Sequence, residues 1–244
     1  MITNGVKRKA APNPTNWQYS THKSCAKSEA KLPKKCSIKD KFPPVYRQQY
    51  GNCTSNAALG CDHYYYHTDK WIPSTTFTYY VQKDMTHDLK ADDGSCIEFA
   101  LDAVRKYGAC NSKVWPNEKP WNEKPSKEAY ADGKHGHEVT SYYMVKNLTE
   151  IKKALSSGYP VALAMDWVNS TLTDEYILYE PSREELKDCY SGHAIVLVGY
   201  DDEKKLIEFR NSWGSDWGNN GYAYMTYTTL KRCAWYEDSY AVIK

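Results

Sequence analysis

The 244-residue chain has no long run of apolar residues, and its amino terminus lacks the pattern of an export signal. Met1 to Ala11 carries the basic residues Lys7, Arg8 and Lys9, but no apolar stretch follows them. A secretory signal needs an apolar stretch after its basic residues, and a membrane-spanning helix needs about 20 apolar residues. We therefore expect a protein without a membrane span that is not exported by the secretory route. It would be cytosolic or packaged within a particle, with a viral origin as one option.

A strong charge imbalance is also absent, because 32 lysines and arginines against 30 acidic residues give a formal charge of +2. Without a broad basic surface or a zinc-finger spacing, nucleic-acid binding is not expected. The histidines do not cluster with other metal ligands, and we interpret His135-Gly136-His137 as a solvated loop. We expect neither a metal nor an organic cofactor.

Helical patterns come early in the chain and strand patterns late. We predict a helix from Cys53 to His67 with an apolar face at Ala57, Cys61 and Tyr64, and Thr54, Asn56 and Asp62 turned elsewhere. A second helix starts at a capping-box pattern, residues 95–98, and stops at Gly108, and a third covers residues 149–157. Strands are predicted at residues 161–165, 194–200, 206–211 and 222–227. This order predicts an α+β protein.

Three residues could together perform nucleophilic catalysis: Cys53, His193 and Asn211. The histidine and asparagine follow the cysteine by roughly 140 and 160 residues, close to the separations in papain-type peptidases. A thiol is a useful nucleophile only when its pKa is lowered, by a helix amino terminus or a nearby imidazolium. Cys53 is predicted at the start of a helix, where the helix dipole stabilises a thiolate.

The segments around these residues resemble the papain family of cysteine peptidases over about residues 32–244. The nucleophile segment reads Cys53-Thr54-Ser55-Asn56-Ala57 and resembles the Cys-Thr-Ala-Asn-Ala that is common in the bacterial, archaeal and viral branch. Further similar segments occur in the family's order. These are residues 32–33, 43–46, 92–95, 106–110, 191–194, 210–214 and 213–222. The resemblance implies two lobes with the active-site cleft between them: a helical lobe at residues 32–140 and an antiparallel, β-barrel-like lobe at residues 141–244.

By this resemblance, Cys53 attacks a peptide carbonyl, His193 transfers protons, and Asn211 orients the imidazole ring under the cover of Trp213. The family's oxyanion hole also uses a glutamine upstream of the cysteine. Here Gln48 fits that role if one residue is deleted before Gly51, and Gln49 is the alternative.

The resemblance also indicates where an extended peptide would bind. Gly94 would let the peptide approach the backbone closely, and Ile97, Ala164 and Gly192 would line a pocket for an apolar side chain. A short capped helix within residues 181–188 would restrict one end of the cleft. The implied function is endopeptidase cleavage by a monomer. The alternatives are an exopeptidase or peptide ligase using the same residues, and a catalytically weak protein that binds peptides.

Residues 1–31 lack hydrophobic periodicity and contain Pro12 and Pro14, so we interpret them as an arm rather than a domain. Two interpretations stay open: a disordered or strapped tail, and a minimal propeptide that lies across the cleft. In the second case, removal near Lys31-Leu32 should raise activity, and the protein would be a zymogen.

The eight cysteines leave seven after Cys53 is assigned to catalysis, so at least one of the seven is unpaired within a monomer. In a reducing compartment most would be free thiols. Cys189 and Cys233 fall near positions that are bridged in secreted relatives, and form the one pair to test.

Overall fold

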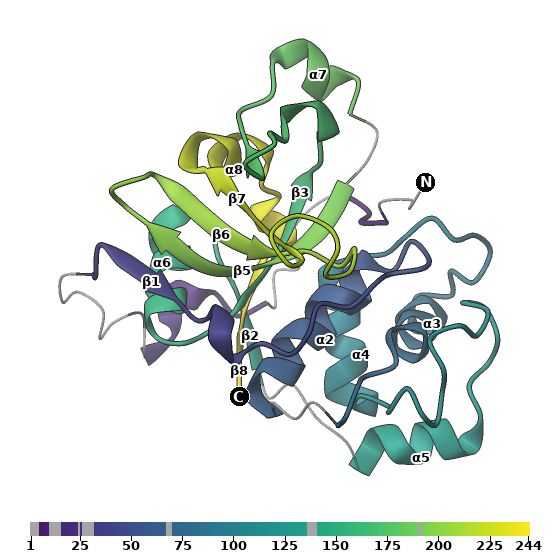
Figure 1. Ribbon diagram of the computed structural model, residues 1–244. Helices are drawn as coiled ribbons and strands as arrows, with labels where there is room; N and C mark the ends of the chain where they lie inside the picture. Colours follow the sequence, from purple (N-terminus) through teal and green to yellow (C-terminus); the bar gives the residue numbers. More distant parts are fainter. Residues whose placement is uncertain are drawn as a thin grey trace.

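The computed structural model describes residues 5–9, 16–23, 25, 32–66, 70–135, 141–189 and 192–244. Four helices form one lobe: α2 (Cys53–Tyr66), α3 (Thr75–Met85), α4 (Ile97–Tyr107) and α5 (Lys127–His135). The second lobe is built on a large sheet, and Figure 1 shows the two lobes joined along α2 and β5. The predicted α+β class is confirmed.

The sheet has the strand order β2-β8-β3-β5-β6-β7-β4, with β1 paired to β5 outside this path. Its pairs are antiparallel except for β4 with β7, and among the described strands the edges β2 and β4 do not pair. The lobe that we expected to be barrel-like is therefore an open sheet. The strands are β1 (Lys35–Ser37), β2 (Ser141–Met144), β3 (Val161–Asp166), β4 (Ile177–Leu178), β5 (Gly192–Asp201), β6 (Leu206–Arg210), β7 (Tyr222–Thr226) and β8 (Tyr240–Ile243).

Short helices complete the β lobe. α6 (Leu148–Ser156) and α8 (Tyr227–Cys233) pack against the sheet, and α7 (Arg183–Lys187) lies in the loop before β5. Single 3₁₀ turns are η1 (Tyr19–Thr21), η2 (Lys39–Lys41), η3 (Asn169–Thr171) and η4 (Tyr236–Asp238). The predicted short helix before His193 is confirmed as α7, with a capping box between Ser182 and Glu185.

Helix α2 starts at Cys53 as predicted, but its predicted amphipathic face is wrong. Thr54, Asn56 and Asp62 are as buried as Ala57 and Cys61. The helix packs against α3 and α4 on one side and against β3 and β5 on the other, so it has no solvent face. The nucleophile candidate therefore lies on the central helix of the molecule.

The start of α4 also differs from the prediction. Its N-cap, Cys96, makes no side-chain capping bond, so the predicted capping box is absent. Instead, the carboxylate of Asp238 in η4 accepts from the backbone N–H groups of Ile97 (2.7 Å) and Glu98 (3.1 Å). A residue 140 positions away in sequence thus caps the helix and fastens the helical lobe to the β lobe. Gly108 ends the helix with φ = 72°, as predicted.

The arm and the lobe boundary both differ from the predictions made from the sequence. β1 pairs with β5, so the first residues of the predicted helical lobe belong to the sheet. The second half of the arm packs on the opposite edge, where Met144 donates to the carbonyl of Trp17 (2.8 Å) and Tyr19 is completely buried. These described parts of the arm are therefore part of the fold.

No disulfide joins the eight cysteines, all of which lie in the described residues. The pair singled out from the sequence, Cys189 and Cys233, forms no disulfide, and Cys189 Sγ donates to the carbonyl of Trp167 (3.3 Å). Within the described ranges, no three or more metal-ligating side chains gather at one place. The pair around His135 falls partly outside those ranges. None of the helices described is both long and apolar enough to cross a bilayer.

Candidate active site

Cys53 occupies the first position of α2, and its side chain is completely buried at the junction of the two lobes. Four backbone N–H groups lie close enough to its sulfur to lower the thiol pKa: those of Gly5, Ala194, Thr54 and Cys53 itself. Ala194 directly follows His193 in β5. The thiol of the helical lobe and the histidine strand of the β lobe therefore meet, as predicted.

His193 and Asn211 form the second half of the site, on β5 and just after β6. His193 Nε2 lies 2.7 Å from Asn211 Oδ1, and both residues are buried. Asn211 Oδ1 also accepts from the backbone N–H of Ser212 (2.8 Å), so this oxygen is an acceptor. The hydrogen of a neutral His193 ring must then be on Nε2, which leaves a lone pair on Nδ1. Nδ1 has no hydrogen-bond partner among the described residues, so it is available to accept a proton.

Two tryptophans hold the imidazole ring in place. Trp213 stacks on His193 with ring centroids 4.9 Å apart, and Trp167 meets it edge-on at 5.0 Å. The predicted cover by Trp213 is thus present. Trp167 was missed, because its sequence neighbourhood carries no motif and only the β3–β5 pairing brings it to the histidine.

Burial keeps both reacting groups uncharged in this structure. It raises the pKa of the Cys53 thiol to about 11, against the smaller opposing effect of the backbone N–H groups. It lowers the pKa of His193 to about 4, against the smaller effect of the bond to Asn211. At neutral pH the pair is therefore a thiol beside a neutral imidazole rather than a thiolate–imidazolium pair.

Of the two glutamines, Gln48 is the one that lies at the site. Its backbone N–H donates to Ser212 O (2.8 Å), and its Oε1 accepts from Ser212 Oγ (2.6 Å). Gln48 is buried whereas Gln49 is exposed. With Oε1 accepting from Ser212, the Nε2 group points the other way and donates to Tyr50 O (3.1 Å).

The described amino-terminal residues 5–9, which we name the strap, fill the junction above Cys53. Val6 N–H donates to Gly192 O (3.3 Å), Ser95 N–H donates to Gly5 O (2.8 Å), and Lys7 N–H donates to Ser95 O (2.8 Å). The strap pairs antiparallel with Gly192 and parallel with Ser95. It therefore adds a strand between the lobes in the way a bound peptide does.

Two glycines permit this close approach. A Cβ atom on Gly94 would lie 1.8 Å from Gly5 O, and a Cβ on Gly5 would lie 1.9 Å from Gly51 O. Gly94 also has φ = 85°, which favours glycine. Gly94 thus permits the close approach of the strap, while the hydrogen bonds come from its neighbour Ser95; its role toward a substrate stays a prediction.

The other predicted pocket residues lie around the same junction. Gly192 contacts Val6, and a Cβ there would meet Val6 and Trp235 at 2.3 Å. Ile97 begins α4 beside Asp238, and Ala164 in β3 accepts from Trp235 N–H (2.8 Å). Both are completely buried, so their role as pocket walls stays a prediction. Trp235 was missed, since it lies 42 residues after His193 and outside any motif.

Comparisons with known proteins agree with this geometry. A family model described as papain family cysteine protease matches residues 37–243. The chain belongs to the papain family. An uncharacterised peptidase C1-like protein of Acanthamoeba polyphaga mimivirus is 29% identical over 72% of this chain and 62% of its own length. Procathepsin L of Mus musculus is 26% identical over 79% of this chain and 60% of its own length.

Two solved structures are similar to this chain over nearly its whole length. Xylellain, a cysteine protease from Xylella fastidiosa, has a TM-score of 0.81 at 26% identity, over 99% of this chain and 97% of its own. Digestive procathepsin L 3 of Tenebrio molitor has a TM-score of 0.72 at 18% identity, over 76% of its own length. The chain spans about two fifths to three fifths of the length of four curated relatives that it matches.

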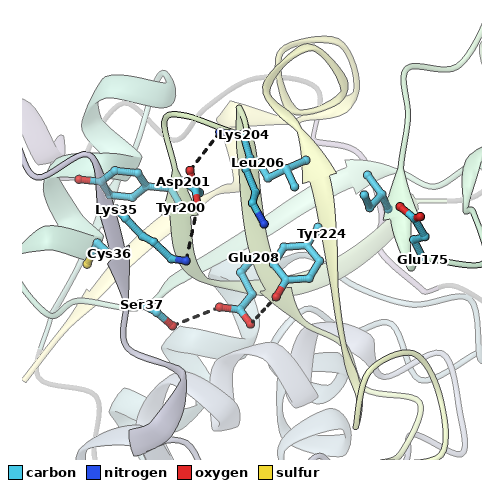
Figure 2. A pocket seen from close by; sticks show the side chains of 11 residues that line it. Lys35, Cys36, Ser37, Glu175, Tyr200, Asp201, Lys204, Leu206, Glu208 and Tyr224 are labelled. Carbon is cyan, nitrogen blue, oxygen red and sulfur yellow. Dashed lines mark hydrogen bonds and ion pairs between the residues drawn. The ribbon is translucent and has the colours of Figure 1, made fainter.

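A separate pocket of about 270 Å³ lies on the β lobe, away from the papain-family site (Figure 2). Its polar groups pair with one another: Asp201 with Lys35 (3.5 Å), and Glu208 with both Ser37 (3.1 Å) and Tyr224 (3.4 Å). These contacts fasten β1 to β5, β6 and β7. None of the candidate catalytic residues lines this pocket; its lining residues are Lys35, Cys36, Ser37, Glu175, Ile177, Tyr200, Asp201, Lys204, Leu206, Glu208 and Tyr224.

Proposed function

We propose that this protein is a cysteine endopeptidase in which Cys53 is the nucleophile, His193 the proton carrier and Asn211 the group that orients it. The observation that carries this proposal is the fixed tautomer of His193. Its Nε2 hydrogen is donated to Asn211, which leaves a lone pair on Nδ1. His193 lies on β5, and the next residue of this strand, Ala194, has its backbone N–H close to the Cys53 sulfur. A buried core histidine would satisfy both ring nitrogens.

The first half of the reaction uses this lone pair. The Cys53 thiol gives its proton to His193 Nδ1, and the resulting thiolate attacks the carbonyl carbon of the scissile peptide bond. The carbonyl oxygen becomes negatively charged, and the Nε2 group of Gln48 and the Cys53 backbone N–H would stabilise it. The imidazolium then donates its proton to the leaving amine, which leaves an acyl group on Cys53.

The second half releases the acyl group. The neutral imidazole of His193 takes a proton from water, the hydroxide attacks the thioester, and the proton returns to the Cys53 sulfur as the carboxylic acid leaves. Asn211 holds the ring through both transfers, and Trp213 and Trp167 keep bulk water from the His193–Asn211 bond. The whole cycle needs residues of this chain and water.

We further propose that the structure is a self-inhibited form. The Gly5 carbonyl is bonded to Ser95 N–H rather than presented to Gln48, so the Gly5–Val6 peptide bond is not held for attack. The strap excludes solvent from Cys53 and His193, which supports the neutral state of the pair. Displacement of the strap would expose Cys53 and His193 to water. Water would lower the free-energy cost of charging the two side chains and let the thiolate–imidazolium pair form. Of the two interpretations of the arm, the contacts favour an inhibitory segment.

The test is peptide hydrolysis by the full chain and by a chain that begins at Asn16. The shorter chain lacks the strap but keeps Trp17, whose carbonyl accepts from Met144 N–H of β2, and the buried Tyr19. We expect hydrolysis by the shorter chain, little by the full chain, and none by either with Cys53→Ala. A folded shorter chain that binds peptides without cleaving them would contradict the proposal and favour a peptide-binding protein.

A further inference from the structure

Gly94 and Ser95, which we name the edge, are held from behind by helix α3. Gly94 N–H donates to Tyr79 Oη (3.1 Å), and Lys83 Nζ donates to Gly94 O (3.3 Å). Tyr79 and Lys83 are one helical turn apart, so they lie on the same face of α3. Both backbone groups of Gly94 are therefore bound by α3, while the N–H and the carbonyl of Ser95 pair with the strap.

The lysine among these contacts is fully buried and belongs to the fold rather than to the strap. A buried lysine is costly unless carboxylates pair with it. Lys83 Nζ lies 2.7 Å from Asp93 and 3.0 Å from Asp88, and Lys7 of the strap meets the same two carboxylates at 2.8 and 2.6 Å. Because Lys83 lies on α3, its own ion pairs do not need the strap. The edge therefore keeps this support once the strap has left.

The tyrosine connects the edge to the loop that carries the nucleophile. Asp92 Oδ1 accepts from Tyr79 Oη (2.8 Å) and from Gly51 N–H (2.9 Å), and Gly51 lies two residues before Cys53. Burial and the neighbouring carboxylate of Asp92 raise the pKa of Tyr79, so its hydroxyl keeps the hydrogen that it donates. The hydroxyl thus accepts from Gly94 and donates to Asp92, and it fixes the edge relative to Cys53.

We propose that Tyr79 and Lys83 are positioning residues of the peptidase, which hold the edge at the place from which it can pair with an extended substrate. This inference rests on the proposed peptidase function. Both side chains act through the backbone of Gly94 rather than on the Cys53 thiol. A substrate along the edge would form its backbone hydrogen bonds with Ser95 only while Gly94 keeps its orientation.

A positioning role differs from simple stabilisation of the fold in what it does to different substrates. Loss of stability alone affects every substrate of the folded enzyme alike. Loss of the edge affects only substrates that are long enough to pair with Ser95. A small thiol reagent does not pair with the edge at all, so its rate reports on Cys53 itself.

The experiment introduces Tyr79→Phe, which removes one hydroxyl, into the chain that begins at Asn16. The substrates are a peptide amide with several residues before the cleaved bond and an ester of a single acylated amino acid. We expect KM for the peptide to rise roughly tenfold with kcat within about twofold, because the backbone hydrogen bonds are made on binding and kept in the transition state. For the ester, kcat/KM should change by less than about twofold, as should the rate at which iodoacetamide alkylates Cys53. Lys83→Met should give the same pattern.

In the full chain the same substitution should act in the opposite direction, because the edge there holds the strap. Tyr79→Phe should raise the rate of Cys53 alkylation by iodoacetamide at least roughly threefold. Tyr80→Phe is the matched control: it removes the same hydroxyl one position further along α3, from a side chain that packs in a separate cluster with Phe77 and Ala103. It should leave the kinetics of the shorter chain and the alkylation of the full chain within about twofold.

Three results would overturn this inference and leave the peptidase proposal intact. These are equal losses for the peptide and the ester, a loss confined to kcat, and a Tyr79→Phe variant that behaves like Tyr80→Phe. Failure of the unsubstituted shorter chain to hydrolyse either substrate would instead count against the proposed function. The alkylation rates of the full chain would then still decide whether Tyr79 holds the edge.

Discussion

At the scale of single residues, the site depends on the direction of two hydrogen bonds. Ser212 N–H fixes Asn211 Oδ1 as an acceptor, and this oxygen fixes the hydrogen of His193 on Nε2. The residue types were predictable from the sequence, since Cys53, His193 and Asn211 lie within their motifs and follow one another in the family's order. The bond from Ser212 was not, because it depends on the turn that follows β6.

The choice between the two glutamines gives a direct prediction. Gln48→Ala should lower kcat of the strap-free enzyme by roughly 10²–10³, the usual cost of losing one oxyanion donor. Gln49→Ala should change kcat by less than about threefold, because Gln49 is exposed and Gln48 buried. Steady-state kinetics of the two variants checks this. Equal losses, or a larger loss for Gln49→Ala, would contradict the assignment.

The ionisation of the pair gives a second prediction. With the strap in place the pKa of Cys53 is raised to about 11 and that of His193 lowered to about 4. Both shifts favour the uncharged pair between these values. The thiolate absorbance near 240 nm should therefore not differ between the full chain and its Cys53→Ala variant at pH 5–8. In the chain that begins at Asn16 a difference should appear within this range. A thiolate signal in the full chain at pH 6 would contradict the proposed inhibited state.

At the scale of elements, the strap is the segment that the sequence described least well. Lys7, Arg8 and Lys9 suggested only a charged arm. The structure shows residues 5–7 paired with two segments from different lobes, an arrangement that hydrophobic periodicity cannot reveal. For the same reason the sequence did not predict the cap of α4, because the capping group is Asp238 rather than a neighbour in sequence.

The fit of the strap can be tested with one substitution. A Cβ on Gly5 would lie 1.9 Å from the backbone of Gly51, so Gly5→Ala should displace the strap. An overpacking cost of about 1–3 kcal/mol corresponds to a rise in activity of roughly five- to 150-fold in the full chain. Arg8→Ala is the control, because the Arg8 side chain is 61% exposed. Peptide hydrolysis by the full-length variants measures the effect. If Gly5→Ala is no more active than Arg8→Ala, the strap does not control the site.

At the scale of the whole molecule, the lobes are one unit because α2 is buried between them and Arg210 fastens the segment that leads to Gln48. Arg210 donates to Pro43 O (3.0 Å) and Pro44 O (2.7 Å) and lies 4.9 Å from the ring centre of Tyr46. The two-lobe order and the middle strands were predictable from periodicity. The open sheet, its edge strands and the burial of polar residues on α2 were not, because they follow from packing between distant segments.

Removal of Arg210 tests this connection. Arg210→Met should lower the free energy of unfolding by about 2–4 kcal/mol, since the buried guanidinium of Arg210 and its hydrogen bonds to Pro43 O and Pro44 O are lost. Arg183→Met, on the exposed start of α7, should change it by less than about 0.5 kcal/mol. Urea unfolding followed by tryptophan fluorescence measures both variants. Similar stabilities for the two would show that Arg210 does not hold the segment in place.

The central claim is that Cys53 is an activated nucleophile covered by residues 5–9. The most direct test is the intact mass after treatment with an epoxide inactivator of thiol peptidases at about pH 5, where an ordinary thiol is almost entirely protonated. We predict one adduct on the chain that begins at Asn16, mapped to Cys53 and absent from its Cys53→Ala variant, and far slower labelling of the full chain. Labelling of another cysteine, no labelling of the folded shorter chain, or equal rates for both chains would contradict the account.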